Sequence, residues 1–458
     1  MRAPNPAFAK IHSDLSAVLW PPVSTGRSAV LVAALRQLED SQWLPRGEIA
    51  ARQLRQLGLL AAHCEKFSPH FRKRLRAAGL TAAALTSAEA LQRLPLLRRR
   101  DLQEADGLFC EEVPAGHAPL SKVRTSGSTG EPVVVRRTAV SDFDWSLYTL
   151  REYFWQGCDF SKPFCAIRAN IGEPARLPHW GGVVSQLFDG TGPSLGLPIT
   201  TDTGRLIEMI GDFGPESLLA YPSTLAALAR EGAARGIALP GLRHIRTVGE
   251  TLSPQRRADI ARVFTAKISD CYSSQEAGYI ASECPDAPLY HLMETVIVEI
   301  VDESGAPCRE GESGRVIVTD LRNFATPLIR YEIGDYAEAG PPCPCGRGLA
   351  TLSRIFGRER NLILMPDGRR FWPVVGGYYF RDIAPIRQFQ VVQQARDSLQ
   401  VRLVSETPVT PEQEDQLRAV INNALGYPFR LEFIYFDETI PPGANGKFEE
   451  FTCLLKQP

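Results

Sequence analysis

The spacing of hydrophobic and polar residues divides the chain into regions. From about residue 29 to residue 104 the apolar side chains recur every three or four positions, which is typical of helices with one buried face. The clearest apolar stripe consists of Ile49, Leu54, Leu57 and Leu60. We therefore predict a helical lead-in within residues 1–120, with the stripe in the core.

After Lys122 short β-branched runs alternate with helical stretches at residues 206–213, 223–234 and 254–264. This alternation predicts an α/β fold with a mainly parallel sheet. Residues 295–319 read as strands separated by turns, and we expect a smaller antiparallel unit there.

The last part of the chain has a different order of elements. From near Gly357 it reads strand, strand, helix (411–424), strand, which is typical of a small α+β domain. The expected organisation is a large N-terminal domain (1–357) and a small C-terminal domain (358–458).

Composition and charge exclude several classes of function. The formal net charge is -1, so nothing in the charge balance favours nucleic acid or an anionic membrane as a partner. The N-terminus lacks a signal-peptide core, and apolar runs fall far short of the ~20 residues of a membrane span. We expect a cytoplasmic protein.

Ten cysteines in a chain of 458 residues predict thiols or metal ligands rather than a disulfide framework. Six of them have no ligand-like neighbour in the sequence: Cys64, Cys110, Cys158, Cys165, Cys308 and Cys453.

The segment Thr125-Ser126-Gly127-Ser128-Thr129-Gly130-Glu131-Pro132 precedes a β-branched run. Its glycines allow backbone N–H groups to approach an anion, and its hydroxyls add donors, which suits a nucleotide triphosphate. The spacing and lysine of a Walker loop are missing, which disfavours a P-loop kinase. A flexible Ser/Gly turn is an equal alternative for this segment alone.

Further motifs follow in a fixed order: D-C-Y-S-S-Q-E ending at Glu276, P-L-I-R-Y-E-I-G-D ending at Asp335, Gly357-Arg358, and Gly446-Lys447. Together with the loop and the helical entry L-Q-R-L-P-L-L-R-R-R-D-L, they resemble the adenylate-forming superfamily of acyl-coenzyme A synthetases, luciferases and adenylation domains. The resemblance is strongest to its phenylacetate–coenzyme A ligase branch and covers nearly the whole chain.

The resemblance implies a role for each motif. The segment from Thr125 to Gly130 would bind the β- and γ-phosphates of ATP, Tyr272 would pack on adenine, and Glu276 would coordinate Mg²⁺. Asp335 would accept hydrogen bonds from the ribose hydroxyls, and Arg358 would reach the ribose or a phosphate. Arg330, in the same motif as Asp335, is expected to form a structural ion pair.

Lys447 lies in the turn-rich segment I-P-P-G-A-N-G-K-F. A flexible ammonium from the small domain can stabilise the charge that develops at the α-phosphorus and at the attacking carboxylate, so Lys447 is the predicted catalytic lysine. An exposed surface lysine is the alternative. Gly249-Glu250 and the segment 221–223 match pocket walls of the family and could equally be turns.

A metal site is predicted from Cys284, His291, Cys343 and Cys345. Three thiolates and an imidazole are a ligand set that structural Zn²⁺ prefers, and the branch resembled here carries the same residues at these places. Four unrelated reduced residues are the alternative. The zinc would hold the loop after Glu276 against the loop after Asp335.

The chain departs from the family pattern at two places. Ser273 and Gln275 replace the usual glycine after the tyrosine and the hydroxyl residue before the glutamate, and Gln275 could donate to the α-phosphate. Arg360 and Asn361 stand where many relatives have an acidic pair beyond the hinge.

We therefore predict an enzyme that uses MgATP to adenylate a carboxylic acid, aryl or aryl-acetic by its branch, and passes the acyl group to coenzyme A. An amine or a carrier-protein thiol is the alternative acceptor, and a non-catalytic nucleotide-binding protein on the same fold is the alternative from another class. Phe143, Trp145, Trp180 and Phe188 lie in the stretch that lines the acyl pocket of relatives, although core packing explains them equally well. The sequence does not decide whether the protein forms a homodimer.

Overall fold

The computed structural model describes residues 8, 10–124, 132–358, 361–371, 373, 378–441 and 448–455. The chain divides into two compact units. The first holds the described residues of 1–125, 133–333 and 337–355, and the second holds those of 126–132, 334–336 and 356–458. No helix of the described residues combines the length and the apolar character needed to cross a membrane.

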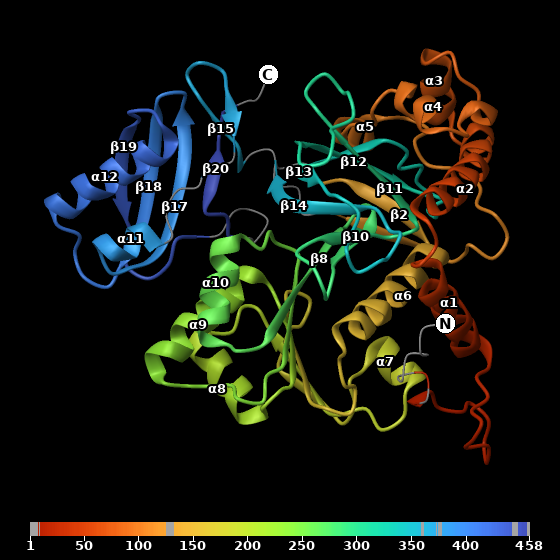
Figure 1. The fold of residues 1–458 in the computed structure, drawn as a ribbon, viewed down its shortest axis with the longest axis horizontal. Coiled ribbons are helices and arrows are strands. Elements are labelled where there is room, and N and C mark those ends of the chain that lie inside the picture. Colours follow the sequence, from red (N-terminus) through yellow and green to blue (C-terminus); the bar gives the residue numbers. More distant parts are fainter. Residues whose placement is uncertain are drawn as a thin grey trace. The chain divides into compact units, whose positions relative to one another are not determined.

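The predicted helical lead-in is present in the first unit (Figure 1). Its helices are α1 (Gly26–Ser41), α2 (Arg46–Phe67), α3 (Pro69–Ala77), α4 (Ala88–Arg93) and α5 (Arg99–Glu104), with the short 3-10 turn η2 (Ala82–Ala84). Three of the four residues of the predicted stripe on α2, Ile49, Leu57 and Leu60, are buried, and Leu54 is half-buried. Leu59, outside the stripe, is 66% exposed. Burial of such a stripe supplies most of a helix's stability in a folded protein.

A mixed sheet of twelve strands forms the core of the fold, in the order β11-β12-β13-β14-β10-β9-β8-β7-β6-β3-β5-β4. The strands are β3 (Phe164–Arg168), β4 (Ala175–Leu177), β5 (Ser194–Pro198), β6 (Ser217–Ala220), β7 (His244–Val248), β8 (Lys267–Ser274), β9 (Gly278–Glu283), β10 (Tyr290–Leu292), β11 (Val296–Val301), β12 (Ser313–Asp320), β13 (Tyr331–Ala339) and β14 (Thr351–Arg358). Neighbours among β5, β3, β6, β7 and β8 run parallel, which confirms the predicted parallel region.

Helices lie on both faces of this parallel region. They are α6 (Ala139–Gln156), α7 (Gly182–Leu187), α8 (Thr203–Phe213), α9 (Pro222–Arg235) and α10 (Pro254–Val263). Ile245 of β7 packs with α8, α9 and α10, which Figure 1 shows together in green. Its neighbour Arg246 points to the other face and contacts Glu152 of α6. The alternation along β7 is that of a strand buried on both sides.

The strands of residues 295–319 pair antiparallel as predicted, with Val296 opposite Asp320. They do not form a separate sheet, however, because β12 is hydrogen-bonded to β13 within the large sheet. The expected small β unit is therefore one end of the main sheet. The spacing of strands in a sequence cannot show which sheet a hairpin joins.

The second unit contains the predicted strand–strand–helix–strand pattern. Its elements are β15 (Ile363–Leu364), β16 (Arg370–Phe371), α11 (Tyr378–Ile383), β17 (Ile386–Ala395), β18 (Ser398–Ser405), α12 (Pro411–Leu425), β19 (Arg430–Tyr435) and β20 (Phe451–Cys453). The four longer strands form a sheet in the order β19-β18-β17-β20. Leu417 and Ile421 of α12 pack on Val391 and Val401 of this sheet in a core of its own.

Candidate active site and metal cluster

Tyr272 and Glu276 belong to the hairpin that joins β8 to β9. The two strands pair with Ser274 opposite Gly278, and the register shifts between Tyr272 and Ser273. The Ala277 backbone N–H donates to Ser274 Oγ at 2.8 Å and closes the turn. Tyr272 is 8% exposed, and Glu276 is 2% exposed. The hairpin thus holds a buried carboxylate beyond the carboxyl end of a parallel strand, where α/β folds bind their ligands. Gln275, by contrast, is exposed, and Ser273 is half-buried.

Glu276 forms an ion pair with a residue that the sequence did not single out. Arg99 Nη1, at the start of α5, lies 3.5 Å from Glu276 Oε1. The Arg99 side chain is 29% exposed and that of Glu276 is 3% exposed. Arg99 is the middle member of the run R-R-R, and a run of three basic residues gives no sign of which one points inward.

Gly249 and Glu250 follow β7 directly. Glu250 Oε2 accepts the backbone N–H of Ser223 at 2.9 Å, and its Oε1 accepts the Ser223 hydroxyl at 3.0 Å. The carboxylate therefore caps the first turn of α9. Gly249 adopts φ +81°, and a Cβ there would lie 3.1 Å from the Tyr221 ring. Both residues lie at the carboxyl edge of the sheet, and their place in a pocket wall stays a prediction.

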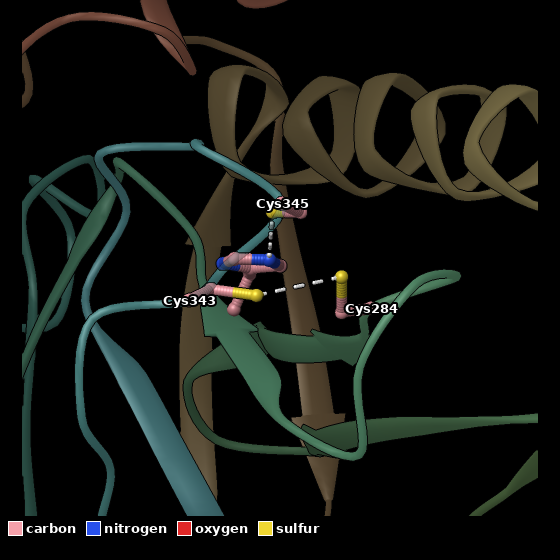
Figure 2. Close-up of side chains that lie close together, drawn as sticks. Cys284, Cys343 and Cys345 are labelled. Carbon is pink, nitrogen blue, oxygen red and sulfur yellow. Dashed lines mark hydrogen bonds between the residues drawn. The ribbon is translucent and has the colours of Figure 1, made fainter.

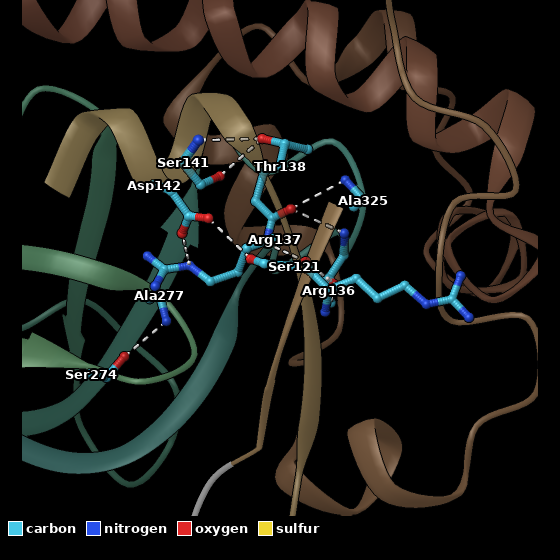
Figure 3. Close-up of polar contacts among 11 residues, drawn as sticks. Ser121, Arg136, Arg137, Thr138, Ser141, Asp142, Ser274, Ala277 and Ala325 are labelled. Atoms are coloured by element: carbon cyan, nitrogen blue, oxygen red, sulfur yellow. Dashed lines mark hydrogen bonds and ion pairs between the residues drawn. The ribbon is translucent and has the colours of Figure 1, made fainter. Parts of the chain in front are cut away.

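The predicted phosphate loop, Thr125 through Gly130, lies outside the described residues. Its flanking strands β1 (Leu120–Arg124) and β2 (Val134–Thr138) pair antiparallel, with Arg124 opposite Val134. The backbone of Arg136 is held at both polar groups, since its N–H donates to Thr326 Oγ1 and its carbonyl accepts from Asn323 Nδ2 and Thr326 Oγ1 (Figure 3). Strand β2 is therefore fixed to the segment that joins β12 to β13, and β1 is held through its pairing with β2.

Arg137 connects β2 with the Glu276 hairpin. Its Nε lies 3.7 Å from Asp142 Oδ1, and Ser121 donates to the other oxygen of the same carboxylate at 3.0 Å (Figure 3). Its Nη2 lies only 2.6 Å from the position that a Cβ would take on Gly278, so the guanidinium packs directly on the hairpin backbone. A side chain at residue 278 would have to displace it.

Asp335 and Arg358 lie in the second unit. Arg358 Nε is 3.1 Å from Asp335 Oδ1, and Gly334, at φ +82°, would place a Cβ 3.4 Å from the Arg358 guanidinium. The structure thus pairs two of the predicted nucleotide-binding residues. Lys447 and Arg360 lie outside the described residues. Arg330 pairs with Glu299 at 3.0 Å and donates to backbone carbonyls, which confirms the predicted structural ion pair.

The four predicted metal ligands form two pairs that are distant in the sequence, and the two pairs come together in the first unit (Figure 2). Cys343 Sγ lies 3.7 Å from Cys284 Sγ, and Cys345 Sγ lies 3.4 Å from His291 Nε2. All four ligand atoms are within 4.8 Å of one another. Tetrahedral Zn²⁺ with Zn–S bonds of ~2.3 Å separates its sulfurs by about 3.8 Å, so the spacing fits such an ion.

Burial and neighbouring arginines shift the pKa values of the side chains in this cluster. Burial lowers the pKa of His291 to about 3, and Arg347 and Arg151 add to the effect, so the imidazole is neutral at pH 7 and its lone pair is available. Burial raises the pKa of Cys343 to about 12. Burial acts in the same direction on Cys345, but hydrogen bonds from Arg347 outweigh it and lower the pKa of that thiol.

Four aromatic residues were candidates for the acyl pocket. Trp180 and Phe188 are 5% and 3% exposed and pack with Leu31 and Leu35 of α1. Phe143 is partly buried against the same cluster. Trp145 packs instead edge-on against Tyr279 of β9, with ring centroids 5.6 Å apart. Core packing therefore accounts for the first three, and Trp145 lies near the Glu276 hairpin.

The structure also brings together residues that no sequence motif connected. Arg246 of β7 lies 2.6 Å from Glu152 of α6, and the Tyr279 hydroxyl also donates to this carboxylate. Cys64 and Cys110, which looked isolated, have sulfurs 3.9 Å apart, and Cys158 Sγ lies 3.1 Å from His244 Nδ1. Only tertiary contacts reveal such pairs, because their members are distant in sequence.

No protein-family model matches the chain. The phenylacetate-coenzyme A ligase of Thermus thermophilus is 27% identical over 71% of this chain and 74% of its own length. The enzyme of the same name from Escherichia coli K12 is 24% identical over 83% of this chain and 89% of its own length. The fold resembles that of a 2-hydroxyisobutyryl-CoA ligase in the postadenylation state, with TM-score 0.72, 18% identity and 91% of each chain covered. In sequence the chain is therefore similar to phenylacetate-coenzyme A ligases over most of its length, and it shares its fold with a coenzyme A ligase, as the resemblance of its motifs predicted.

Proposed function

We propose that the protein uses ATP to convert a carboxylic acid into an acyl-adenylate and then transfers the acyl group to coenzyme A. In the first step a carboxylate oxygen forms a bond to the α-phosphorus, and the bond from that phosphorus to pyrophosphate breaks. In the second step the coenzyme A sulfur bonds to the acyl carbon, its proton is lost, and AMP leaves.

The β8–β9 hairpin is the observation that carries this proposal. It presents a buried glutamate four residues after a buried tyrosine, beyond the carboxyl ends of β6, β7 and β8. A carboxylate shielded from water suits the binding of a hard dication that bridges phosphate oxygens. Two relatives of similar sequence are phenylacetate-coenzyme A ligases by name, which agrees with the proposal.

The roles proposed for individual residues follow the motif order. Tyr272 packs on adenine, and Asp335 with Arg358 binds the ribose side of the nucleotide. Glu276 holds Mg²⁺, which when bound offsets charge on the phosphates. The loop from Thr125 to Gly130 binds the β- and γ-phosphates, and Lys447 stabilises the reacting centre.

The cluster of Cys284, His291, Cys343 and Cys345 is proposed as a structural zinc site. The spacing of the sulfurs and the neutral imidazole support it. The ligands belong to the segments after β9, in β10 and before β14, so a bound ion would join three neighbouring segments of the sheet.

Exchange of labelled pyrophosphate into ATP tests the first step. We expect exchange that depends on an added acid from a panel of aryl and aryl-acetic acids, and we expect Lys447→Ala to reduce it by ~100-fold or more. Wild-type protein that exchanges with none of the acids would overturn the proposal. Thioester formation with coenzyme A tests the second step, and exchange without a thioester would indicate an amine or carrier-protein acceptor.

A further inference from the structure

Three consecutive arginines stand at the start of α5, with Arg98 at the N-cap and Arg99 and Arg100 in the first turn, and their side chains differ in surroundings. Arg98 Nε lies 3.8 Å from Glu332 Oε2, and its side chain is 54% exposed. Arg100 is exposed. Arg99 turns toward the β8–β9 hairpin, where its Nη1 lies 3.5 Å from Glu276 Oε1. Of the three arginines, Arg99 is thus the one that pairs with the buried carboxylate of Glu276.

The backbones on both sides of this ion pair are fixed. On the α5 side the Leu97 N–H donates to the Arg330 carbonyl at 2.8 Å, and the Glu332 N–H donates to the Leu97 carbonyl at 2.9 Å. Leu102 anchors α5 in the core. On the other side the contact from Ala277 to Ser274 closes the Glu276 turn. These contacts fix the backbones and not the Arg99 guanidinium, which stands at the end of a long stem with several rotatable bonds.

The charge of Arg99 balances that of the buried Glu276 carboxylate. A carboxylate that is 3% exposed is costly to keep ionised unless a cation lies beside it, and the guanidinium of Arg99 supplies that cation. The proposed function gives the same carboxylate to Mg²⁺. A buried oxygen that is already paired with a guanidinium binds a metal ion less well, because metal binding must first break the pair.

We propose that Arg99 is the counter-cation of Glu276 in the nucleotide-free enzyme, and that a divalent cation must displace it. This inference rests on the proposed assignment of Glu276 as the metal ligand. Arg99 thereby weakens binding of the free cation and favours entry of the metal together with the phosphates of ATP, which compensate for the broken pair. Arg99 is a positioning residue in this scheme, acting through Glu276.

Binding of Mn²⁺ to the nucleotide-free protein, followed by electron paramagnetic resonance, tests this directly. Mn²⁺ prefers oxygen ligands, so the cysteine cluster does not compete for it. Arg99→Met removes the charge while keeping most of the stem, and we expect it to tighten Mn²⁺ binding by about tenfold. Arg99→Lys keeps the positive charge, so its affinity for Mn²⁺ should be close to that of wild type. Arg98→Met and Arg100→Met remove equivalent charges from the same run and should leave the affinity unchanged.

Glu276→Gln separates this inference from the proposed function. If Glu276→Gln binds Mn²⁺ as well as wild type when ATP is present, the metal role of Glu276 fails and both proposals fall. If Glu276→Gln loses Mn²⁺ but Arg99→Met binds it no tighter than wild type, the counter-cation role alone is overturned. The same conclusion follows if Arg99→Met binds no Mn²⁺ up to millimolar concentrations, or if the tightening persists in the double variant Arg99→Met/Glu276→Gln.

Discussion

Arg358 at the end of β14 places its Nε 3.1 Å from Asp335 Oδ1 on β13. The carboxylate is 9% exposed and the arginine side chain 38% exposed, so one partner is shielded while the other reaches solvent. The pair joins the two residues that the motif order assigns to the ribose side of the nucleotide. In the proposed function this contact would hold the Asp335 side chain in place before nucleotide binds, and so would reduce the entropy cost of binding.

The first prediction concerns this pair. Asp335→Ala removes an acceptor for two hydroxyl groups and leaves Arg358 without its partner, so we expect ATP affinity to fall by at least about tenfold. Isothermal titration calorimetry measures the effect. Glu338→Ala, which removes a carboxylate from the same strand, serves as the control. Equal affinities of the two variants would contradict the assignment.

The proposed zinc site of Cys284, His291, Cys343 and Cys345 gives the second prediction. Protein purified without chelator should carry about one zinc per chain, and Cys343→Ser should lose it. The melting temperature should fall by several degrees, because the metal joins segments that are distant in sequence. Metal analysis and thermal unfolding measure both effects. Cys308→Ser removes a cysteine outside the cluster and should change neither, whereas zinc-free wild-type protein would refute the site.

The contact between Glu250 and Ser223 gives the third prediction. Glu250→Ala removes the cap of α9 and should lower the free energy of unfolding by about 1 kcal/mol. Ser223→Ala keeps the backbone N–H and loses only the hydroxyl bond, so its cost should be smaller. Urea unfolding compares the two variants. If Glu250→Ala impairs ATP binding while Ser223→Ala does not, the carboxylate also has a role in the pocket, and a purely structural cap is excluded.

The fourth prediction is a pH dependence of stability. Burial raises the pKa of Asp144 to about 7, although Arg322 opposes the rise. In the unfolded chain this aspartate loses its proton near pH 4, so between about pH 4 and pH 7 the folded state keeps a proton that the unfolded state has released. Its contribution therefore lowers stability as the pH rises through this window.

Asp144→Asn removes this titration. The stability of the variant relative to wild type should increase between pH 5 and pH 8, with a change on the order of 1–3 kcal/mol. Urea unfolding at the two pH values measures it. Asp142→Asn, two positions away on the same helix with a half-exposed side chain, is the matched control. A difference between variant and wild type that does not depend on pH would show that Asp144 is ionised throughout.

The sequence by itself determined the elements and the chemistry of the motifs. Periodicity was sufficient for α2 and α12, because a helix that buries one face must repeat its apolar residues about every 3.6 positions. The ligand set of Cys284, His291, Cys343 and Cys345 was also readable, since few functions need three thiols and an imidazole. The resemblance to phenylacetate–coenzyme A ligases was also readable from the sequence, because the order of motifs is a one-dimensional property.

The tertiary structure decided which residues meet. The attachment of β11 and β12 to the main sheet depends on hydrogen bonds to β13, a strand that the sequence does not link to them. That Arg99, and not Arg98 or Arg100, pairs with Glu276 depends on the direction of α5. This direction is set where Leu97, just before the helix, is hydrogen-bonded to Arg330 and Glu332. Long-range pairing and side-chain direction are fixed by packing in three dimensions, so local sequence patterns cannot encode them.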